Sequence, residues 1–394
     1  MKVLHVTFSD NYGGANIAAY RIHKCLENKI ISKILVFDKK LKNEKNVIKI
    51  KNINKLIFKL KNYTARIVNL FFTSKHNNSF NIFDSNLVDS INKSNFDIVH
   101  LHWINNEIIS IKDISRIKKK IVWTIHDMWP FCGSEHYSDS KRYVNGYNSK
   151  NKDLIGIDIP KYIWQLKKKY FSKQINIICP SQWMLKKVNN SYLFKNNNSY
   201  LLRNPINTNI YKCKKIFNKN KNLVKIIFCA VNFLKDKRKG FFKLIKTLNL
   251  LSKKFNFELN VIGEDKFDHN DIKFKINNLG YITDPELISK HLCENDLLFL
   301  PSESDNFPNI GIEALAVGLP VICSRNNGFS EVIQNKFNGL VINNFNTFNL
   351  NYIMNSFKSN NFDRVKIANH AKKNFSYSII STKLVAIYNK ILND

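Results

Sequence analysis

Continuous runs of apolar, β-branched residues alternate with helix-like stretches along the whole chain. One series of runs covers 3–8, 33–37, 97–103, 121–127 and 176–181, and a second covers 225–231, 258–263, 296–302 and 320–324. Runs without alternating polar residues are typical of parallel strands that are covered on both faces. Helical patterns follow at about 15–27, from Gly240, and at 309–317. Two successive series of this kind predict two doubly wound, Rossmann-like α/β domains.

The length of the chain, 394 residues, also favours two domains. A polar, basic stretch with Pro205, at 203–215, is the expected linker. We therefore expect an N-terminal domain at 1–205 and a C-terminal domain at 206–375. The last helical stretch, at about 376–392, is expected to pack back on the first domain.

The cysteines and the apolar runs indicate the cellular compartment in which the protein is expected. The seven cysteines are scattered, with no C-x-x-C pair, so we expect no structural zinc site and a reducing, cytosolic profile. No apolar run reaches the roughly 18 to 20 residues that a membrane span requires. The start, "MKVLHVTFSD", is typical of a strand and not of a signal peptide.

The net charge of +32 indicates a surface for an anionic partner, or a solvated surface enriched by AT-rich codons. Lys, Asn, Ile and Phe are abundant together, which keeps the second explanation open. The chain carries no RNP-like, zinc-finger or helix-turn-helix signature. Nucleic acid is therefore not an expected partner.

The segment at 51–72 is both positively charged and amphipathic. Its apolar residues recur at helical spacing and lysines surround them. Such a helix suits an anionic membrane surface. The same pattern equally suits a helix that packs against the first domain's sheet with its lysines in water.

Polar clusters follow the predicted strands, where open α/β sheets bind ligands. Gly13-Gly14 follows the first strand and precedes a helix, an arrangement that suits an anion or a tight turn. His126 and Asp127 close the 121–127 strand, and we expect His126 to donate a hydrogen bond or move a proton, with Asp127 fixing its orientation. His100, His102 and His126 lack a metal-ligand spacing, so no metal site is predicted.

A basic stretch, "LKDKRKGFF", precedes the helix that begins near Gly240. Lys237, Arg238 and Lys239 together with a helix N-terminus suit a diphosphate. The chain contains neither a P-loop motif nor a D-x-D pair, which argues against a metal-held nucleotide sugar.

The most specific stretch is "PSESDNFPNIGIEALAVGLPVICS". Asp305 opens the turn after a strand, Pro308 suits the first turn of a helix, and Glu313 lies more than a turn into it. A carboxylate accepts hydrogen bonds from paired hydroxyls, such as those of a ribose or a sugar ring. This stretch therefore predicts a site for a polyhydroxylated, phosphorylated ligand.

These motifs resemble the retaining, nucleotide-sugar-dependent glycosyltransferases of the GT-B fold, in the family called glycosyl transferases group one. The family hallmark is Glu-x7-Glu, an Ala-rich helix, G-x-P-V and a further acidic residue, and here Asp305, Glu313, "ALAVGLPVI" and Glu331 occupy those places. "HVTFSDNYGGANIAAYRIHKCL", "IHDMWPFCGSEHY", "PSQW" and "RNPINT" are similar to a subgroup that builds bacterial capsules, colanic-acid-like exopolysaccharides and O-antigens. The resemblance spans nearly the whole chain. It implies two Rossmann-like domains that face a central cleft, the first on the acceptor side and the second binding the nucleotide sugar.

The resemblance also implies residue roles. Glu313 would hold the nucleotide's ribose, Lys239 would neutralise the diphosphate, and Asp305 would hold the transferred sugar. His126 would touch the donor sugar near the reacting centre, which makes His126, Asp305 and Lys239 the expected catalytic residues. The expected donor-binding residues are Gly13, Gly14, Lys237, Arg238, Lys239, Asn306, Phe307, Asn309, Ile310 and Glu313.

The chain departs from the family pattern at two places. Asp305 stands where the family has the longer Glu. The arginine that many members carry after the first strand of the second domain is missing, so Lys235, Lys237 or Arg238 would replace it. The family mechanism is front-face attack, in which the leaving diphosphate helps to deprotonate the acceptor, and electrostatic stabilisation of that diphosphate dominates.

The sequence thus predicts a retaining, metal-independent hexosyltransferase without a cofactor, acting in capsule, O-antigen or lipopolysaccharide synthesis. Its expected partners are a nucleoside-diphosphate sugar and an oligosaccharide or undecaprenyl-diphosphate-linked acceptor. A cytoplasmic location is expected, with a peripheral position at the inner face of the cytoplasmic membrane left open. The alternatives are a GT-B epimerase or phosphorylase and a non-catalytic nucleotide-sugar-binding assembly protein.

Overall fold

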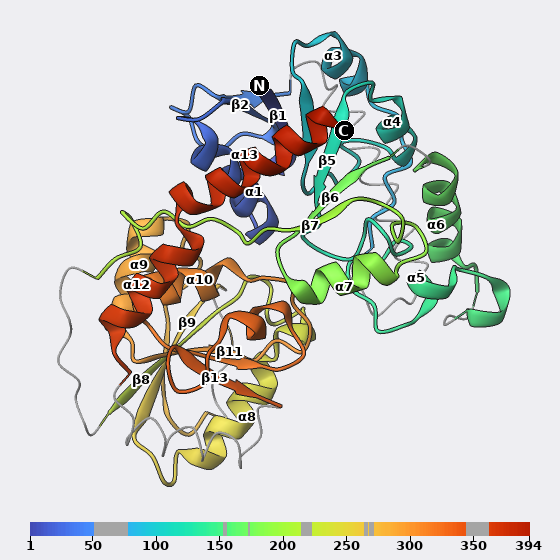
Figure 1. Ribbon diagram of the computed structural model, residues 1–394. Helices are drawn as coiled ribbons and strands as arrows, with labels where there is room; N and C mark the ends of the chain where they lie inside the picture. Colours follow the sequence, from blue (N-terminus) through green and yellow to red (C-terminus); the bar gives the residue numbers. More distant parts are fainter. Residues whose placement is uncertain are drawn as a thin grey trace. The chain divides into compact units, whose positions relative to one another are not determined.

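The computed structural model describes residues 1–50, 78–152, 156–171, 174–213, 223–263, 267, 272–343 and 362–394. These residues divide into two compact units, which Figure 1 shows in ribbon form. Unit 1 comprises Met1–Arg203 and Ser381–Asp394, and unit 2 comprises Asn204–Ile380. The amphipathic segment at 51–72 lies outside the described residues. Within the described part of the chain, no helix has the length and apolarity that a membrane span needs.

The described part of unit 1 is built on a seven-stranded parallel sheet. Its strands are β1 (Lys2–Ser9), β2 (Ile31–Asp38), β3 (Val47–Lys49), β4 (Ile98–Leu101), β5 (Lys120–Thr124), β6 (Asn176–Cys179) and β7 (Ser199–Leu201). They lie in the order β3-β2-β1-β4-β5-β6-β7. The order reverses between β1 and β4, and in doubly wound sheets ligands bind beyond the carboxyl ends of the strands at such a switch point.

Helices accompany this sheet along the chain. They are α1 (Gly14–Leu26), α3 (Leu87–Lys93), α4 (Ile111–Arg116), α5 (Arg142–Asn145), the 3-10 turn η1 (Ser149–Asn151), α6 (Ile159–Tyr170), α7 (Gln182–Asn190) and α13 (Tyr377–Asn393). From Ser381 onward α13 belongs to unit 1. It buries Leu384, Tyr388 and Ile391, which recur at helical spacing. The Tyr388 hydroxyl lies 2.5 Å from Nδ1 of His100 on β4, which ties the helix to the sheet.

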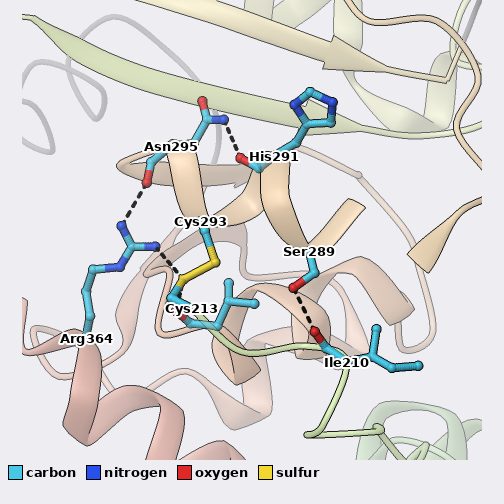
Figure 2. The surroundings of a disulfide bond; sticks show 8 residues. Ile210, Cys213, Ser289, His291, Cys293, Asn295 and Arg364 are labelled. Carbon is cyan, nitrogen blue, oxygen red and sulfur yellow. Dashed lines mark hydrogen bonds between the residues drawn. A yellow bond between two sulfur atoms is a disulfide. The ribbon is translucent and has the colours of Figure 1, made fainter. Parts of the chain in front are cut away.

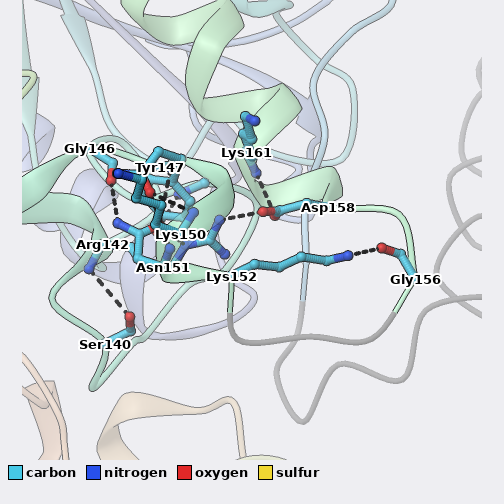
Figure 3. A network of polar contacts seen from close by, with 12 residues as sticks. Ser140, Arg142, Gly146, Tyr147, Lys150, Asn151, Lys152, Gly156, Asp158 and Lys161 are labelled. Carbon is cyan, nitrogen blue, oxygen red and sulfur yellow. Dashed lines mark hydrogen bonds and ion pairs between the residues drawn. The ribbon is translucent and has the colours of Figure 1, made fainter.

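Buried Arg142 stabilises the segment that connects β5 to α6, and Figure 3 shows its contacts. Its guanidinium pairs with Asp158 at 2.5 Å and donates to the Asn151 side chain at 3.2 Å. The guanidinium also stacks 4.3 Å from the centre of the Tyr147 ring. Asp158 in turn caps α6 by accepting from the Lys161 backbone N–H. One buried cation thus ties the turn at Asn151 and the Tyr147 ring to the start of α6.

Unit 2 contains a six-stranded parallel sheet in its described residues. The strands are β8 (Val224–Cys229), β9 (Phe257–Ile262), β10 (Lys275–Asn278), β11 (Leu297–Leu300), β12 (Val321–Ser324) and β13 (Gly339–Ile342), and the order is β10-β9-β8-β11-β12-β13. Here the order reverses between β8 and β11. The helices are η2 (Lys237–Lys239), α8 (Phe241–Leu251), α9 (Pro285–Glu294), α10 (Asn309–Ala316), η3 (Gly328–Val332) and α12 (Arg364–Phe375).

The fold class predicted from the apolar runs is confirmed, because each predicted run contains a buried parallel strand of one of two doubly wound sheets. The runs missed the sheets' outer strands, which have three or four residues each and, except for β13, carry polar side chains. The strands that sequence periodicity did not predict are β3, β7, β10 and β13. An outer strand has a neighbour on only one side, and its sequence is therefore less constrained.

The expected profile of reduced, scattered cysteines is wrong for one pair. Cys213 and Cys293 form a disulfide although 80 residues separate them (Figure 2). Arg364 lies beside the bond, 3.9 Å from Sγ of Cys213, and donates to the Asn295 carbonyl at 3.1 Å. The bond joins α9 to the segment that follows Asn204. A pairing between positions so far apart leaves no local spacing pattern in the sequence.

Candidate functional site

The turn after β8 in unit 2 presents the basic stretch. Asp236 accepts from the Arg238 backbone N–H and pairs with its guanidinium at 2.7 Å. Gly240 then adopts a left-handed conformation with φ 74°, and a Cβ there would lie 2.3 Å from the Pro301 carbonyl oxygen. Only glycine allows this approach. The basic turn is therefore held directly against the segment that follows β11.

Asp305 and Lys239 meet at the switch point between β8 and β11. Lys239 Nζ lies 2.7 Å from Oδ2 of Asp305, and the Arg238 guanidinium lies 3.6 Å from the same oxygen. Arg238 also donates to the Ser304 carbonyl at 2.5 Å. The sequence suggested two separate partners for Lys239 and Asp305, but in the structure they bind each other.

Asp305 is 8% exposed, and its charge is held by its neighbours. Burial alone would raise the pKa of the carboxyl group, but Lys239 and Arg238 outweigh it and lower the pKa below the ordinary value. The second oxygen accepts from the Asn306 backbone N–H at 2.9 Å. The lowered pKa thus favours the ionised carboxylate of Asp305 beside two cations.

The segment from 306 to 310 leads into α10. Asn306 and Phe307 are buried, and the Phe307 ring packs against Phe329 at 5.4 Å. Asn309, the first residue of α10, accepts from the Asn204 side chain at 3.0 Å, and Ile310 is half-buried. Pro308 precedes the helix as its N-cap, where its missing N–H costs nothing.

Glu313 lies inside α10 and is only 5% exposed. It lies near the end of β8, because its charge contributes, after burial, to raising the pKa of the Cys229 thiol. Glu313 therefore lies at the same edge of the sheet as Asp305 and Lys239. Lys237, in contrast, is exposed.

In unit 1, Gly13 and Gly14 form the junction between β1 and α1. Gly13 is the N-cap with φ 79°, and α1 begins at Gly14. The buried Asn16 holds the turn: its carbonyl accepts from the Thr7 hydroxyl at 2.5 Å and its amide donates to the Tyr12 carbonyl at 2.8 Å. This leaves the N-terminus of α1 without a capping side chain.

His126 follows β5 and lies next to another histidine. Its Nε2 is 3.2 Å from Nδ1 of His102, which follows β4. Burial lowers the pKa of His126 to about 4, although Asp127 acts in the opposite direction. The ring is therefore neutral at pH 7. Of the residues predicted in unit 1, Gly13, Gly14 and His126 all lie at the carboxyl edge of the sheet.

Asp127 does not orient His126 as the sequence suggested. Its carboxylate pairs with His136 at 2.7 Å and accepts from the Trp103 indole at 3.2 Å. It also accepts from the Trp129 backbone N–H at 3.0 Å. These bonds fold the loop after β5 back on itself. The prediction was wrong because the side chains of adjacent residues leave the backbone in different directions.

Lys167 on α6 holds the loop that follows β5. The ammonium group is fully buried and donates to the carbonyls of Trp129, Cys132 and Gly133. Burial lowers the pKa of Lys167 to about 7, while three acceptors for three N–H donors favour the charged form. Neither Lys167 nor Asn16 stood out in the sequence, because a lysine in a basic helix and an asparagine near a turn are both common.

Comparison with known proteins decides the family. A model described as Glycosyltransferase Family 4 matches residues 12–210, and a model described as Glycosyl transferases group 1 matches residues 212–374. The chain belongs to glycosyltransferase family 4. Unit 2 of this family 4 glycosyltransferase corresponds closely to the group 1 match, which contains the Lys239–Asp305 pair.

Two relatives of this glycosyltransferase have names that refer to a cps region or to colanic acid biosynthesis. An uncharacterised 41.2 kDa protein in the cps region of Klebsiella pneumoniae is 25% identical, over 65% of this chain and 68% of that protein. A putative colanic acid biosynthesis glycosyl transferase, WcaC of Escherichia coli K12, is 24% identical over 61% of each chain. HepE of Anabaena, solved in complex with UDP-glucose, superposes with a TM-score of 0.64 over 99% of this chain and 100% of that one, at 15% identity. The structural likeness confirms the GT-B fold.

Proposed function

We propose that this family 4 glycosyltransferase moves a hexose, with retention of configuration and without a metal ion, from a nucleoside-diphosphate sugar to a growing, lipid-linked surface polysaccharide. The observation that carries the proposal is the Lys239–Asp305 pair at the switch point of unit 2. Two cations and a carboxylate at a strand end suit a ligand that has both phosphates and hydroxyls.

Lys239 and Arg238 supply the charge that a departing diphosphate needs. In the proposed reaction the bond from the anomeric carbon to the diphosphate oxygen breaks, and the acceptor oxygen bonds to that carbon on the same face. The acceptor's proton passes to the departing phosphate oxygen, so no separate strong base is required. The cations act because negative charge on the diphosphate grows as the bond breaks.

Residues at the same edge of the sheet would make the remaining contacts with the donor. Glu313 would accept hydrogen bonds from the ribose hydroxyls, and Asp305 with the backbone N–H groups of Phe307 and Asn309 would hold the sugar. The paired state of Asp305 is relevant here. When the donor binds, the ammonium group of Lys239 has to interact with both Asp305 and a phosphate. Donor binding therefore changes the Lys239–Asp305 ion pair.

In unit 1, the start of α1 at Gly13-Gly14 is a helix N-terminus, which suits an anion or a sugar hydroxyl. His126, neutral at pH 7, would donate to or accept from the transferred sugar. The acceptor is inferred from the relatives' gene regions. A protein in a cps region and a colanic acid enzyme both concern surface polysaccharide, so a lipid-linked oligosaccharide at the inner face of the cytoplasmic membrane is the proposed acceptor.

Donor binding tests the proposal first. UDP, GDP and dTDP are titrated against the full chain by calorimetry, and at least one is expected to bind. Lys239→Ala should weaken that binding at least tenfold. Lys243→Ala is the matched control, because Lys243 lies on α8, outside the basic turn, and pairs with exposed Glu303, so its removal should have no effect. Equal binding by all three proteins would contradict the assignment.

The reaction type needs a second experiment. The chosen nucleotide sugar is incubated with extracted lipid-linked oligosaccharide, and the anomeric configuration of the product is read by NMR. Retained configuration and full activity in EDTA are expected. Conversion of the donor without an acceptor would favour an epimerase, and binding without any turnover would favour an assembly protein.

A further inference from the structure

Three histidines of unit 1, His5, His102 and His126, form a hydrogen-bonded row. His5 on β1 places Nδ1 3.0 Å from Nε2 of His102, and His102 places Nδ1 3.2 Å from Nε2 of His126. Strand pairing explains the row, since β1, β4 and β5 are consecutive neighbours in the sheet. His5 is fully buried and His102 is 3% exposed.

All three rings are neutral at pH 7. Burial, with the nearby histidines, holds the pKa of His5 and of His102 well below the ordinary value, and burial lowers that of His126 to about 4. A neutral imidazole has one N–H and one bare nitrogen. Each ring that donates on one side must therefore accept on the other, and the row has only two self-consistent arrangements.

The inner end of the row distinguishes these two arrangements. Nε2 of His5 is buried and has no hydrogen-bond partner among the described residues. If the protons pointed from His126 inward, this atom would carry an N–H with no acceptor. If they point outward, the atom is a bare nitrogen. Buried donors without partners are rarer than buried acceptors without partners, so the outward arrangement is favoured.

We propose that His5 and His102 are positioning residues that fix the tautomer of His126, with the proton on Nδ1 and a bare Nε2 that accepts from His102. His126 then carries its proton on Nδ1, so this nitrogen is a hydrogen-bond donor and cannot accept a proton. The use of that donor towards the sugar rests on the proposed function, which already leaves the acceptor's proton to the diphosphate. The tautomer itself does not depend on that function.

A metal ion would be the other explanation for the cluster, since His5, His100 and His102 hold ligand atoms within 4.8 Å of one another. The rings of His100 and His102 are stacked, with centroids 4.2 Å apart and planes 27° from parallel. Lone pairs lie in the ring plane, so two stacked rings cannot both point at one ion about 2.0–2.1 Å away. Both nitrogens of His100 also have hydrogen-bond partners, Tyr388 and Thr124. The rings are therefore packed as hydrogen-bonding groups.

The tautomers are measured by nitrogen NMR on the full chain labelled with ¹⁵N-histidine, without added ligand, at pH 7. For His126 we expect a protonated Nδ1 and a bare Nε2. In His5→Phe, which keeps a ring but removes the donor to His102, the two His126 nitrogen signals should move towards each other as both tautomers become populated. His5 does not touch His126 directly, so a purely structural role would not produce this change.

His23→Phe is the matched control. His23 is also buried and its ring lies 5.9 Å from His5, but its hydrogen bond goes to Ser32 and not into the row. His126 should keep its tautomer in this variant. A protonated Nε2 on His126, an imidazolium at pH 7, unchanged His126 signals in His5→Phe, or stoichiometric zinc in the purified protein would each overturn the proposal. Loss of transferase activity with the expected tautomers would count only against the proposed function.

Discussion

At the scale of single residues, Glu313 makes the sharpest prediction. The carboxylate is buried in α10 at the edge where the donor is proposed to bind. If it holds two ribose hydroxyls, Glu313→Ala should lose roughly 2–4 kcal/mol of donor binding or transition-state stabilisation, about 30- to 1000-fold in kcat/KM. Steady-state donor kinetics measure this.

Glu303→Ala provides the comparison for that measurement. Glu303 lies two residues before Asp305, but its side chain is 62% exposed and pairs with Lys243 at the surface. Exposed ion pairs contribute roughly 0–1 kcal/mol, so its removal should leave the kinetics unchanged. A folded Glu313→Ala variant with wild-type donor kinetics would remove Glu313 from the site.

Sequence reasoning at this scale was successful where the partners share one motif. Asp305, Glu313 and Lys239 could be selected because a strand end followed by a helix start leaves a local pattern. The partners of Asp127 could not be predicted, since Trp103 and His136 reach it only through the pairing of β4 with β5 and the return of the loop. A side chain's direction is decided by packing that no local pattern encodes.

At the scale of elements, α6 holds the loop after β5 through one buried lysine. Lys167→Met keeps much of the side chain's volume but leaves three buried carbonyls without a donor. We expect a loss of about 3–5 kcal/mol in the free energy of unfolding, measured by urea denaturation. Lys169→Met, an exposed change two residues later, should cost less than 1 kcal/mol. A loss below 1 kcal/mol in Lys167→Met would show that the loop is held by other contacts.

The disulfide joins α9 to the start of unit 2 and can be counted chemically. With the Cys213–Cys293 bond formed, alkylation of the urea-unfolded, unreduced protein should modify the five remaining cysteines, and prior reduction should raise this to all seven. An 80-residue separation corresponds to about 4.5 kcal/mol in the chain-entropy model. Reduction should therefore lower the melting temperature of the wild type and leave Cys293→Ser unchanged. Seven modified thiols before reduction would contradict the bond.

At the scale of the whole molecule, the buried histidines determine how the protein responds to acid. Burial lowers the pKa of His100 to about 3 and that of His23 to about 4, whereas an unfolded histidine has a pKa near 6.5. Above pH 6.5 both states are neutral and nothing is lost. As the pH falls from 6.5 towards the folded values, only the unfolded chain gains protons, and each such histidine costs about 1.4 kcal/mol per pH unit.

We therefore expect a steep loss of stability between pH 6.5 and 4, measured as urea midpoints at a series of pH values. The carboxylates whose pKa is lowered, such as Asp305, lose their contribution only below this window. His23→Asn replaces one titrating ring by an amide that can still bind Ser32, and it should make the slope shallower. A stability that is flat from pH 6.5 to 4.5 would contradict the neutral state of the histidines.

Unit 1 is built from two segments that are far apart in the sequence, and this affects the order in which the units can fold during synthesis. The ribosome synthesises residues 1–203 first, but the hydroxyl that binds His100 belongs to Tyr388, 288 residues later, on a helix that is translated after all of unit 2. A nascent chain can therefore complete its second unit before its first. Any chain broken off before Ser381 leaves the His100 side of the first sheet without Leu384, Tyr388 and Ile391. Exposed apolar surface of this kind is what chaperones and proteases recognise. Unit 1 can therefore be completed only in a chain whose second unit has already been translated.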